Sequence, residues 1–477
     1  MKLNLIYSET TDNIIGVNND LFCKIKSDLK MFQTITSTKV NGSQNVVIMG
    51  SNTWKSIGKP LPNRTTVVIT SENIDNDDIL TFKNIIECFE NIQRLNYGSV
   101  FIIGGSKLFL TIIRDYYDLI DIIYQTKINH LINHHDIPSS LQITYNKIVI
   151  NDDFKLLKSK DKNEIGMIHN MKDKYIQSEI NYTENVFQKV KNINLQEYQY
   201  LNTLQDILQK NTMKVSRNGN VYSDFGVRMK FDLRNGFPLL TTKKMPWKTI
   251  LRELIWFING STDNKLLQDK NVHIWDGNGS KDFLESRGLS NEEGDLGPIY
   301  GFQWRHFGAE YINHKTDYTG KGVDQLQWII DEIKSNPTSR RLVMSAWNPI
   351  DIDKMALPPC HVMVQFNIED NYIDAQLYQR SGDMFLGVPF NISSYSFLLH
   401  IIGKLTGYIP RYLIHIIGDA HIYEEHTSAI NEQLLRIPHP FPKLSIDSID
   451  SIDSINENKF KLNNYNYYTP IKGKMIV

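Results

Sequence analysis

The hydrophobic positions of the first 150 residues fall in short runs that alternate with amphipathic stretches. The strand-like runs are LNLIY, NVVIMG, TTVVIT, SVFIIGG and LIDIIYQT, and helix-like stretches such as SDLKMFQTI, IIECFENI and KLFLTII lie between them. This βαβ rhythm predicts an α/β unit, a mostly parallel twisted sheet with helices on both faces. Residues 155–195 are polar and rich in Lys, Asn and Asp. For them we expect a loop, a final strand and a short junction.

The pattern changes from about residue 196. Longer helical stretches (LRELIWFI, QLQWIIDEIK, SYSFLLHIIGKL) mix with longer strand-like runs (RRLVMSAW, HVMVQFNI, IDAQLYQR), which predicts an α+β domain. We therefore expect one domain at 1–190 and another at 197–477, with a short junction at 191–196. Within the second, IDSIDSIDSI at 446–455 repeats every three residues. This repeat predicts a low-complexity loop insertion without chemistry.

Composition narrows the class of protein. A chain of 477 residues is too long for one ordinary domain, and its net charge of −1 gives no general electrostatic case for binding nucleic acid or an anionic membrane. Cys23, Cys88 and Cys360 are odd in number and widely spaced, which favours a reducing compartment over a disulfide framework or a zinc site. No stretch approaches the length of a membrane span, so we expect a soluble cytoplasmic protein.

Two glycine turns and one acid stand out in the N-terminal part. Thr53 follows Gly50 where a helix should begin, and helix N-termini bind phosphate. Gly104 and Gly105 end an apolar strand and open a helix, which would let a ligand approach the backbone closely. A GxGxxG pattern is missing from the sequence, so an ordinary Rossmann dinucleotide site is not supported. Asp28 lies in a first helical turn, where an acid by itself favours the helix dipole.

Together these segments resemble dihydrofolate reductase over about residues 3 to 128, from LNLIY through NIIGVNN, SNTWKSIGKPLPNR and the IIGG turn to IYQTKI. The resemblance implies reduction of dihydrofolate by NADPH, with Asp28 assisting protonation of the pterin. It further implies that Thr126 hydrogen-bonds Asp28, that Phe32 packs on the folate and that Arg64 holds the folate α-carboxylate. The residues implied for NADPH are Gly16, Thr53, Ser71, Gly104, Gly105 and Lys107.

The match departs from the reductase pattern at four positions. Cys23 stands where tryptophan is usual, and Ser8 stands where alanine is common. Ser51 and Ser71 occupy places where an arginine or lysine often binds the 2′-phosphate of the cofactor. The resemblance therefore leaves open how strongly NADPH is preferred over NADH.

In the C-terminal part, ALPPCHVMVQF places Cys360 directly after two prolines and before an alternating strand pattern. Such a cysteine is either a small buried thiol or a rigidly held nucleophile, and a nucleophile needs an electropositive neighbourhood. Glu253 lies in LRELIWFI, a helix that is apolar nearly all round, where a carboxylate needs a partner or a function. A structural salt bridge with an arginine is the alternative for Glu253.

Polar side chains near the strand ends suggest a nucleotide. Each arginine taken singly would be a surface charge, but several together suggest a bound dianion, because guanidinium groups match phosphate oxygens. These arginines are Arg217, Arg340, Arg341 and Arg380. The amide of Asn391 could donate to uracil O4 and accept from N3–H, whereas cytosine would suit an aspartate. A helix cap is the alternative for Asn391.

The C-terminal part resembles thymidylate synthase over nearly all of residues 197–477, in FPLLTTKK, ELIWFINGSTD, GDLGPIYGFQWR, MALPPCH and QLYQRSGDMFLGVPFNISSY. The resemblance implies that Cys360 adds to C6 of deoxyuridylate (dUMP) and that 5,10-methylenetetrahydrofolate supplies the new carbon. Glu253 would organise protons at O4, and Tyr300 would help to remove the C5 proton. The residues implied for dUMP are Arg217, Arg340, Arg341, His361, Arg380, Ser381, Asn391, His421 and Tyr423. Those implied for the folate are Trp275, Asn278 and Asp383.

The resemblance also carries expectations about assembly. Arg340 and Arg341 would cross from a partner subunit, which implies a homodimer. The usual D-R-T-G motif of the synthases reads SRNG here, so Arg217 survives and the change affects loop geometry. A reductase followed by a synthase on one chain implies a bifunctional enzyme.

Two alternatives remain open. One is a pyrimidine hydroxymethylase on the synthase scaffold, and Asn391 argues against its cytidylate version. The other is a reductase domain degraded to a scaffold that supports the dimer. Asp28, Thr126 and Arg64 argue against that second alternative.

Overall fold

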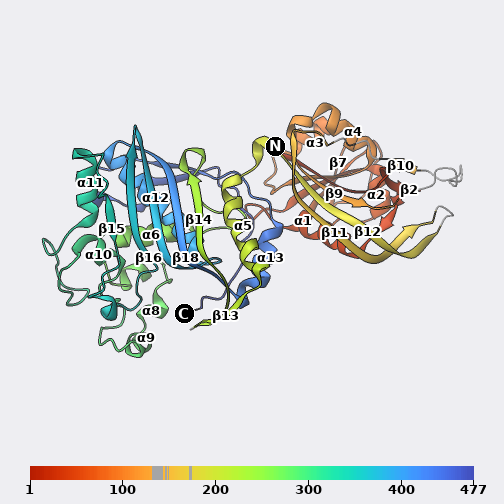
Figure 1. The fold of residues 1–477 in the computed structure, drawn as a ribbon. Coiled ribbons are helices and arrows are strands. Elements are labelled where there is room, and N and C mark those ends of the chain that lie inside the picture. The colour runs from red at the N-terminus through yellow and green to blue at the C-terminus, as the bar shows by residue number, and fades with distance from the viewer. Residues whose placement is uncertain (131–142, 146–147, 149, 171–173, 217, 477) are drawn as a thin grey trace. The chain divides into compact units, whose positions relative to one another are not determined.

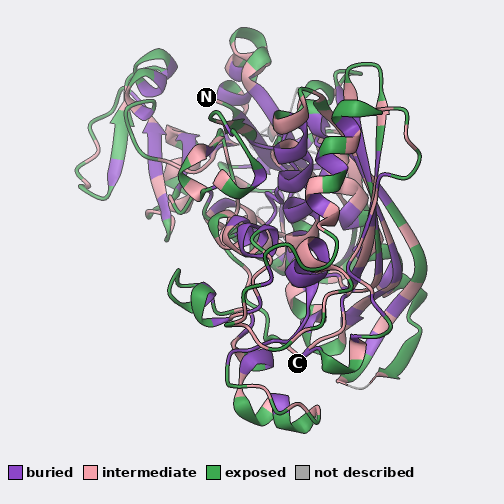
Figure 2. Ribbon diagram, turned by 90° about the vertical axis from the view of Figure 1, so that its left-hand side faces the viewer, coloured by how far each residue is buried: buried purple, intermediate pink, exposed green. Residues whose placement is uncertain are grey.

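The computed structural model describes residues 1–130, 143–145, 148, 150–170, 174–216 and 218–476. The chain divides into two compact units, Met1–Ile193 and Asn194–Val477 (Figure 1). Each unit has its own hydrophobic core, and the buried residues lie along the strands and the inner faces of the helices (Figure 2). None of the described helices combines the length and the apolar character needed to cross a bilayer.

A nine-stranded sheet organises the first unit, in the order β4-β11-β12-β9-β1-β8-β5-β6-β7. Strands β9 to β7 in this order run parallel, and β12, β11 and β4 add to the β9 edge in antiparallel pairs. The strands are β1 Leu3–Thr10, β4 Cys23–Lys24, β5 Asn45–Gly50, β6 Arg64–Ile69, β7 Ile79–Phe82, β8 Val100–Gly104, β9 Ile120–Ile128, β11 Phe154–His169 and β12 Tyr175–Lys189. The central strands are continuous aliphatic runs because both of their faces are covered.

Among the described residues, four α-helices and a small second sheet complete the first unit. The helices are α1 Lys26–Ser37, α2 Ser51–Ile57, α3 Ile85–Ile92 and α4 Ser106–Asp115. The small sheet pairs β2 Ile14–Val17 with β3 Asp20–Leu21 and β10 Ile143–Tyr145. The α/β class predicted from the alternating pattern is confirmed. Both α2 and α4 begin directly after a parallel strand, so their N-termini lie at the carboxyl edge of the sheet, where ligands of α/β folds bind.

For residues 155–195 the expected final strand is β12, but the segment expected to be a loop before it forms a second strand, β11. Strands β11 and β12 form a long antiparallel ribbon, drawn in yellow in Figure 1, that joins the sheet beside β9. Most residues of β11 are exposed or half-buried, so the strand lacks the apolar alternation by which a half-buried strand is recognised. Backbone hydrogen bonds to β12 hold β11 in the sheet, and these bonds do not require hydrophobic side chains.

A six-stranded sheet organises the second unit, in the order β13-β14-β18-β17-β16-β15. Its strands are β13 Met213–Ser216, β14 Gly219–Asp232, β15 Val343–Ser345, β16 His361–Glu369, β17 Tyr372–Asp383 and β18 Ile409–Tyr423. Only β17 and β18 pair in parallel among these described strands. Helix α12, Gly387–Thr406, is buried nearly all round and packs on β17 and β18, as its apolar sequence requires. The predicted α+β class is confirmed.

The remaining helices of the second unit surround this centre. They are α5 Leu195–Lys210, α6 Trp247–Ile258, α7 Lys265–Gln268, α8 Asp276–Gly279, α9 Lys281–Ser286, α10 Tyr300–His306, α11 Gln325–Ser335 and α13 Thr427–Leu435. Near the C-terminus, β19 Lys443–Ile446 pairs with β20 Phe460–Asn463. Helices α6 and α10 pack on each other, which brings Glu253 and Tyr300 to one part of the core.

The IDS repeat has mostly irregular backbone after residue 446, and three of its isoleucines pack into the core. Ile449, Ile452 and Ile455 are all buried in the core of the second unit, and residues 452–454 form a 3₁₀ turn. The 3₁₀ turn puts Ile452 and Ile455, three residues apart, on the same side of the chain. The carboxylate of Asp453 accepts a hydrogen bond from Arg305 at 2.8 Å. The three-residue spacing of these isoleucines therefore agrees with their burial in the core.

Candidate active sites

A cavity of 1110 Å³ opens between the helices and the carboxyl edge of the sheet in the first unit. It is lined by elements that are far apart in the sequence: β1, α1, α2, the turn after β8, and β9. Nearly all the residues expected to bind folate and NADPH contribute to its wall. These are Gly16, Asp28, Phe32, Thr53, Arg64, Gly104, Gly105, Lys107 and Thr126. Ser71 is exposed and lies outside the described lining, so the structure does not bring it to this cavity.

Asp28 is the acid of this cavity. It lies in the first turn of α1, and its Oδ1 accepts a hydrogen bond from the Thr126 hydroxyl at 2.6 Å. Burial raises the pKa of Asp28 to about 6, and the charges of Glu184 and Glu164 act in the same direction. The Thr126 hydroxyl and the Lys162 ammonium oppose them. A carboxyl group with a pKa near neutrality can hold or release a proton under physiological conditions.

Arg64 and Phe32 lie together on another wall of the cavity. The Arg64 guanidinium lies 5.8 Å from the centre of the Phe32 ring. Its Nε donates to the Pro62 carbonyl at 2.9 Å and its Nη1 donates to the Thr36 hydroxyl at 2.8 Å. Arg64 is buried, so these bonds fix a cation in place beside an aromatic face. Such a pair suits an aromatic ligand that carries a carboxylate.

The glycine turn after β8 is shaped by Thr53. Gly104 has a φ of +131°, which a residue with a side chain rarely adopts, and a Cβ there would come within 3.2 Å of Thr53 Oγ1. A Cβ on Gly105 would meet the same oxygen at 3.4 Å. The two glycines thus leave backbone bare beside the start of α2, in the part of the cavity that Lys107 also lines.

In the second unit, Cys360 is half-buried directly before β16, and Arg380 of β17 lies beside it. The Arg380 Nε donates to the Pro359 carbonyl at 2.8 Å, and Nη2 donates to the Pro358 carbonyl at 3.0 Å. Nη2 also lies 4.0 Å from the Cys360 sulfur. The prolines fix the chain before the cysteine, and a guanidinium beside a thiol favours the thiolate. The nucleophile reading of Cys360 therefore has the cation that it needs.

Tyr300 and His361 pack against the backbone of Cys360. The Cys360 amide donates to the Tyr300 hydroxyl oxygen at 2.6 Å. The His361 ring stacks on Tyr300 with centroids 4.1 Å apart, and its Nδ1 lies 2.9 Å from the Tyr395 hydroxyl. Burial lowers the pKa of His361 to about 3, so the imidazole is neutral, and burial raises the pKa of Tyr300. Sequence reasoning missed Tyr395, which lies in the FNISSY motif but carries no signal of its own.

Glu253 of α6 is paired with an indole. Trp275 Nε1 donates to Glu253 Oε1 at 2.8 Å, so the described partner is not the arginine that the salt-bridge alternative required. Burial raises the pKa of Glu253 to about 7, and the Trp275 bond opposes that rise. Trp275 is itself packed near Tyr300, with ring centroids 6.1 Å apart. Glu253 is thus a proton-holding group in the same cluster as Tyr300.

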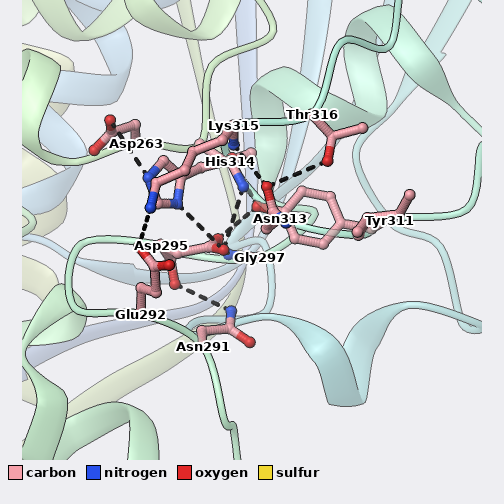
Figure 3. Close-up of polar contacts among 12 residues, drawn as sticks. Asp263, Asn291, Glu292, Asp295, Gly297, Tyr311, Asn313, His314, Lys315 and Thr316 are labelled. Atoms are coloured by element: carbon pink, nitrogen blue, oxygen red, sulfur yellow. Dashed lines mark hydrogen bonds and ion pairs between the residues drawn. The ribbon is translucent and has the colours of Figure 1, made fainter.

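A buried polar network holds the segment that leads into Tyr300 (Figure 3). Asp295 is 2% exposed and accepts hydrogen bonds from the Tyr311 hydroxyl at 2.5 Å and from the Gly297 amide at 3.0 Å. His314 lies between two carboxylates, 3.4 Å from Asp295 and 3.8 Å from Asp263. These contacts tie the turn before α10 to the segment that follows α6. Sequence reasoning missed this network, because His314 is 19 residues from Asp295 and 51 residues from Asp263 in the chain, so no short motif contains both partners of a contact.

Asp383 occupies a different electrostatic setting. It ends β17 and accepts hydrogen bonds from the amides of Phe385 at 2.8 Å and Leu386 at 3.3 Å. Burial alone would raise its pKa, but His426, 3.8 Å away, and these amides hold the pKa of Asp383 below its ordinary value. Asp383 is therefore a fixed anion, in contrast to Glu253. His426 is a residue that the sequence motifs did not single out.

The other predicted synthase residues lie at strand ends and on helices. Asp383 of β17 is directly opposite His421 of β18, and Ser381 is opposite Asp419. The His421 and Tyr423 rings meet edge to face with centroids 5.2 Å apart. Asn278 is buried in α8. Asn391 lies inside α12, whose N-cap is Leu386, so the helix-cap alternative for Asn391 is wrong.

Arg340 and Arg341 are exposed on the segment before β15. Arg217 lies outside the described residues.

Comparisons with known proteins agree with both sites. The family model described as dihydrofolate reductase matches residues 2–163, and the one described as thymidylate synthase matches residues 198–477. A bifunctional dihydrofolate reductase-thymidylate synthase of Zea mays is 40% identical, with 99% of this chain and 96% of that protein covered. One of Paramecium tetraurelia is 38% identical, with 99% and 98% covered. A thymidylate synthase of Equine herpesvirus 2 is 56% identical over 52% of this chain and 87% of its own.

An acid in a ligand-sized cavity in one unit and a cation-held cysteine in the other define a chain with two enzyme sites. Full-length similarity to proteins that carry both activities makes the assignment more specific. The chain belongs to the family of bifunctional dihydrofolate reductase-thymidylate synthases. This result favours the bifunctional reading over a hydroxymethylase and over a reductase reduced to a scaffold.

The raised pKa of Glu253 predicts a pH dependence of stability. Between the ordinary value of 4.5 and the folded value of about 7, the folded state binds more protons than the unfolded state, so stability falls as pH rises. Above neutrality, the ionised Glu253 side chain lowers the free energy of unfolding by about 3 kcal/mol. Glu253→Gln should remove it, so the variant should gain stability over the native protein at about pH 8 and gain little at about pH 5.

Urea unfolding followed by tryptophan fluorescence measures this difference, because Trp54 is the only tryptophan that precedes residue 194. Glu285→Gln, an exposed glutamate in α9, is the matched control and should follow the native protein at both pH values. An equal effect of Glu253→Gln at both pH values would contradict the assigned protonation.

Proposed function

We propose that this chain carries out two linked reactions of thymidylate synthesis. The C-terminal unit converts dUMP and 5,10-methylenetetrahydrofolate to thymidylate and dihydrofolate, and the N-terminal unit reduces that dihydrofolate to tetrahydrofolate with NADPH. The observation that carries the proposal is the geometry around Cys360. Arg380 Nη2 lies 4.0 Å from the Cys360 sulfur, and the Tyr300 hydroxyl accepts a hydrogen bond from the Cys360 amide. Family membership and the cavity around Asp28 support the second reaction.

In the synthase reaction, the Cys360 thiolate forms a bond to C6 of dUMP, and C5 becomes nucleophilic. C5 then bonds to the methylene carbon of the folate, the C5 proton leaves, and the bond between that carbon and the folate nitrogen breaks. A hydride from the tetrahydrofolate ring completes the methyl group, so the folate is oxidised to dihydrofolate, and the Cys360 bond to C6 breaks. Arg380 favours the thiolate at the start and again when the sulfur departs.

Glu253 and Tyr300 handle protons in this sequence. Glu253, with a pKa of about 7, can donate to and accept from O4 as charge forms and disappears there. Tyr300 is oriented by the Cys360 amide, which places its hydroxyl beside the nucleophile for removal of the C5 proton. Asn391 is assigned to the uracil ring, and Arg217, His361, Arg380, Ser381, His421 and Tyr423 to the rest of dUMP. Trp275, Asn278 and Asp383 are assigned to the folate.

In the reductase reaction, Asp28 holds the pterin and supports its protonation at the ring. A carboxyl group with a pKa of about 6, fixed by the Thr126 hydroxyl, suits this role. Phe32 provides an apolar face for the folate, and the buried Arg64 provides a cation for its α-carboxylate. NADPH supplies a hydride when it is bound.

The residues on the cavity wall fit that cofactor. The bare backbone of Gly104 and Gly105 beside Thr53 leaves room that any Cβ would fill, and Lys107 adds a cation to the same part of the cavity. Gly16 is equally constrained, because a Cβ there would come within 2.7 Å of the Asp20 carbonyl oxygen. We assign these residues to NADPH. We do not assign Ser71 to this cavity, because it is exposed and does not line the wall.

We also propose a homodimer with shared synthase sites. Arg340 and Arg341 are exposed on their own chain, which supports their use by a neighbouring subunit. For the compartment we propose the cytosol, supported by three free cysteines, two of them buried.

Single substitutions should separate the two activities. Cys360→Ser should remove the nucleophile and lower thymidylate formation by at least about a thousandfold while dihydrofolate reduction continues. Asp28→Asn should lower dihydrofolate reduction by about a hundredfold or more and leave thymidylate formation intact. Each reaction is assayed alone, with its own substrates supplied. Thymidylate formation by the Cys360→Ser protein at the native rate would refute the proposal.

A mixing experiment tests the shared site. Cys360→Ser and the double variant Arg340→Ala, Arg341→Ala should each be nearly inactive as synthases. Co-expressed in equal amounts, they should recover about a quarter of the native activity, because half of the dimers are mixed and each mixed dimer has one intact site. The separately purified parents are the controls. No recovery from mixed dimers would mean that the arginines serve their own subunit.

A further inference from the structure

The β11–β12 ribbon brings a group of charged side chains to the side of Asp28 that faces the sheet. Thr126 of β9, whose hydroxyl holds Asp28, is directly opposite Glu184 of β12. Side chains of directly opposite residues lie on the same face of a sheet. Glu184 therefore lies on the face where Asp28 lies, next to the threonine that orients it.

The pairing of β12 with β11 extends this face. Tyr182, two residues before Glu184, is opposite Lys162, and Ile180 is opposite Glu164. The Lys162 ammonium lies 2.5 Å from the Glu184 carboxylate. The Lys162 side chain is 27% exposed and that of Glu184 is 12% exposed, so the pair is partly shielded from water and from salt. Such shielding lets the pair act on a neighbouring group more strongly than a surface pair would.

The same face also supports the N-terminus of α1. The Glu164 carboxylate accepts a hydrogen bond from the Ser27 amide at 3.1 Å, and the Tyr182 hydroxyl hydrogen-bonds the Ser27 hydroxyl. Ser27 precedes Asp28 in the chain. The ribbon therefore fixes both the backbone that carries Asp28 and the charges that surround it.

We propose that the Lys162–Glu184 ion pair is a positioning element of the reductase site that sets the charge of Asp28. The inference rests on the proposed reductase function and concerns residues outside the cavity wall. The positive charge of Lys162 offsets the negative charge of Glu184, so the net charge that Asp28 meets from these three residues is that of Glu164. If Lys162 were absent, two carboxylates would face Asp28 and hold a proton on it. If Glu184 were absent, the ammonium would act alone and expel that proton.

The ionisable groups around Asp28 agree in sign with this arrangement. Burial is the main cause of its raised pKa, Glu184 and Glu164 raise the pKa further, and Lys162 lowers it. On β4, Cys23 is buried, and burial together with the Asp28 charge raises the pKa of its thiol to about 12, so it stays neutral. Tyr182 also has a raised pKa and is neutral. The Lys162–Glu184 pair is thus the adjustable part of the surroundings.

Opposite shifts from the two single variants test the proposal. In full-length protein, Lys162→Gln should move the midpoint of the pH profile of reductase kcat/KM up by about half a pH unit or more, and Glu184→Gln should move it down by a similar amount. The double variant should return close to the native midpoint, and Lys162→Arg should keep it. A purely structural role would lower activity without moving midpoints in opposite directions.

Two further measurements separate the possible failures. The pH dependence of methotrexate binding reports the Asp28 charge without turnover, because a basic diaminopteridine pairs with a carboxylate, and its midpoint should shift in the same way. The synthase activity of each variant measures how much of its chain is folded. Lys155→Gln removes an exposed lysine of β11 and is the control for the change of charge. Midpoints that stay unchanged, or move in one direction for both variants, overturn the inference. A native protein without reductase activity overturns the proposed function instead, and methotrexate binding still decides the role of the pair.

Discussion

The synthase site depends on one guanidinium that holds the backbone before its nucleophile. Arg380 donates to the carbonyls of Pro358 and Pro359 and places its charge 4.0 Å from the Cys360 sulfur. Backbone carbonyls away from water need hydrogen-bond donors, and the Arg380 fork supplies them to Pro358 and Pro359. The same bonds fix the cysteine amide toward Tyr300. Arg380 therefore both fixes the backbone before Cys360 and favours the thiolate of that residue.

The two units use burial differently to prepare carboxyl groups. Glu253 and Asp28 each have a raised pKa because protein replaces water around them, and each keeps one neutral hydrogen-bond donor. Asp383 is as strongly enclosed, but two amides and His426 keep it ionised. The chain thus has acids that exchange protons and an acid that stays charged, and the difference lies in the number and charge of their donors.

The sequence predicts the elements of the sites better than their surroundings. The α/β and α+β classes follow from the pattern of hydrophobic positions. The Asp28–Thr126 bond follows from the resemblance to dihydrofolate reductase, and an arginine beside Cys360 follows from the chemistry that a nucleophilic thiol needs. The β11–β12 ribbon escaped prediction because its pairing is made by backbone and its side chains are polar on much of both faces. For the IDS repeat, composition predicted a loop but gave no sign that Ile452 would be buried in the core. Contacts between distant segments, such as Lys162 with Glu184, have no local signature.

The central claim is that one chain both produces dihydrofolate and consumes it. The most direct measurement is one incubation of purified protein with dUMP, methylenetetrahydrofolate and NADPH, followed by chromatography of thymidylate and the folates. The account predicts that thymidylate and tetrahydrofolate form together, with NADPH consumed in equal amount and little dihydrofolate left. Thymidylate that forms while dihydrofolate accumulates and NADPH stays unused would contradict the claim, because the first unit would then be only a scaffold.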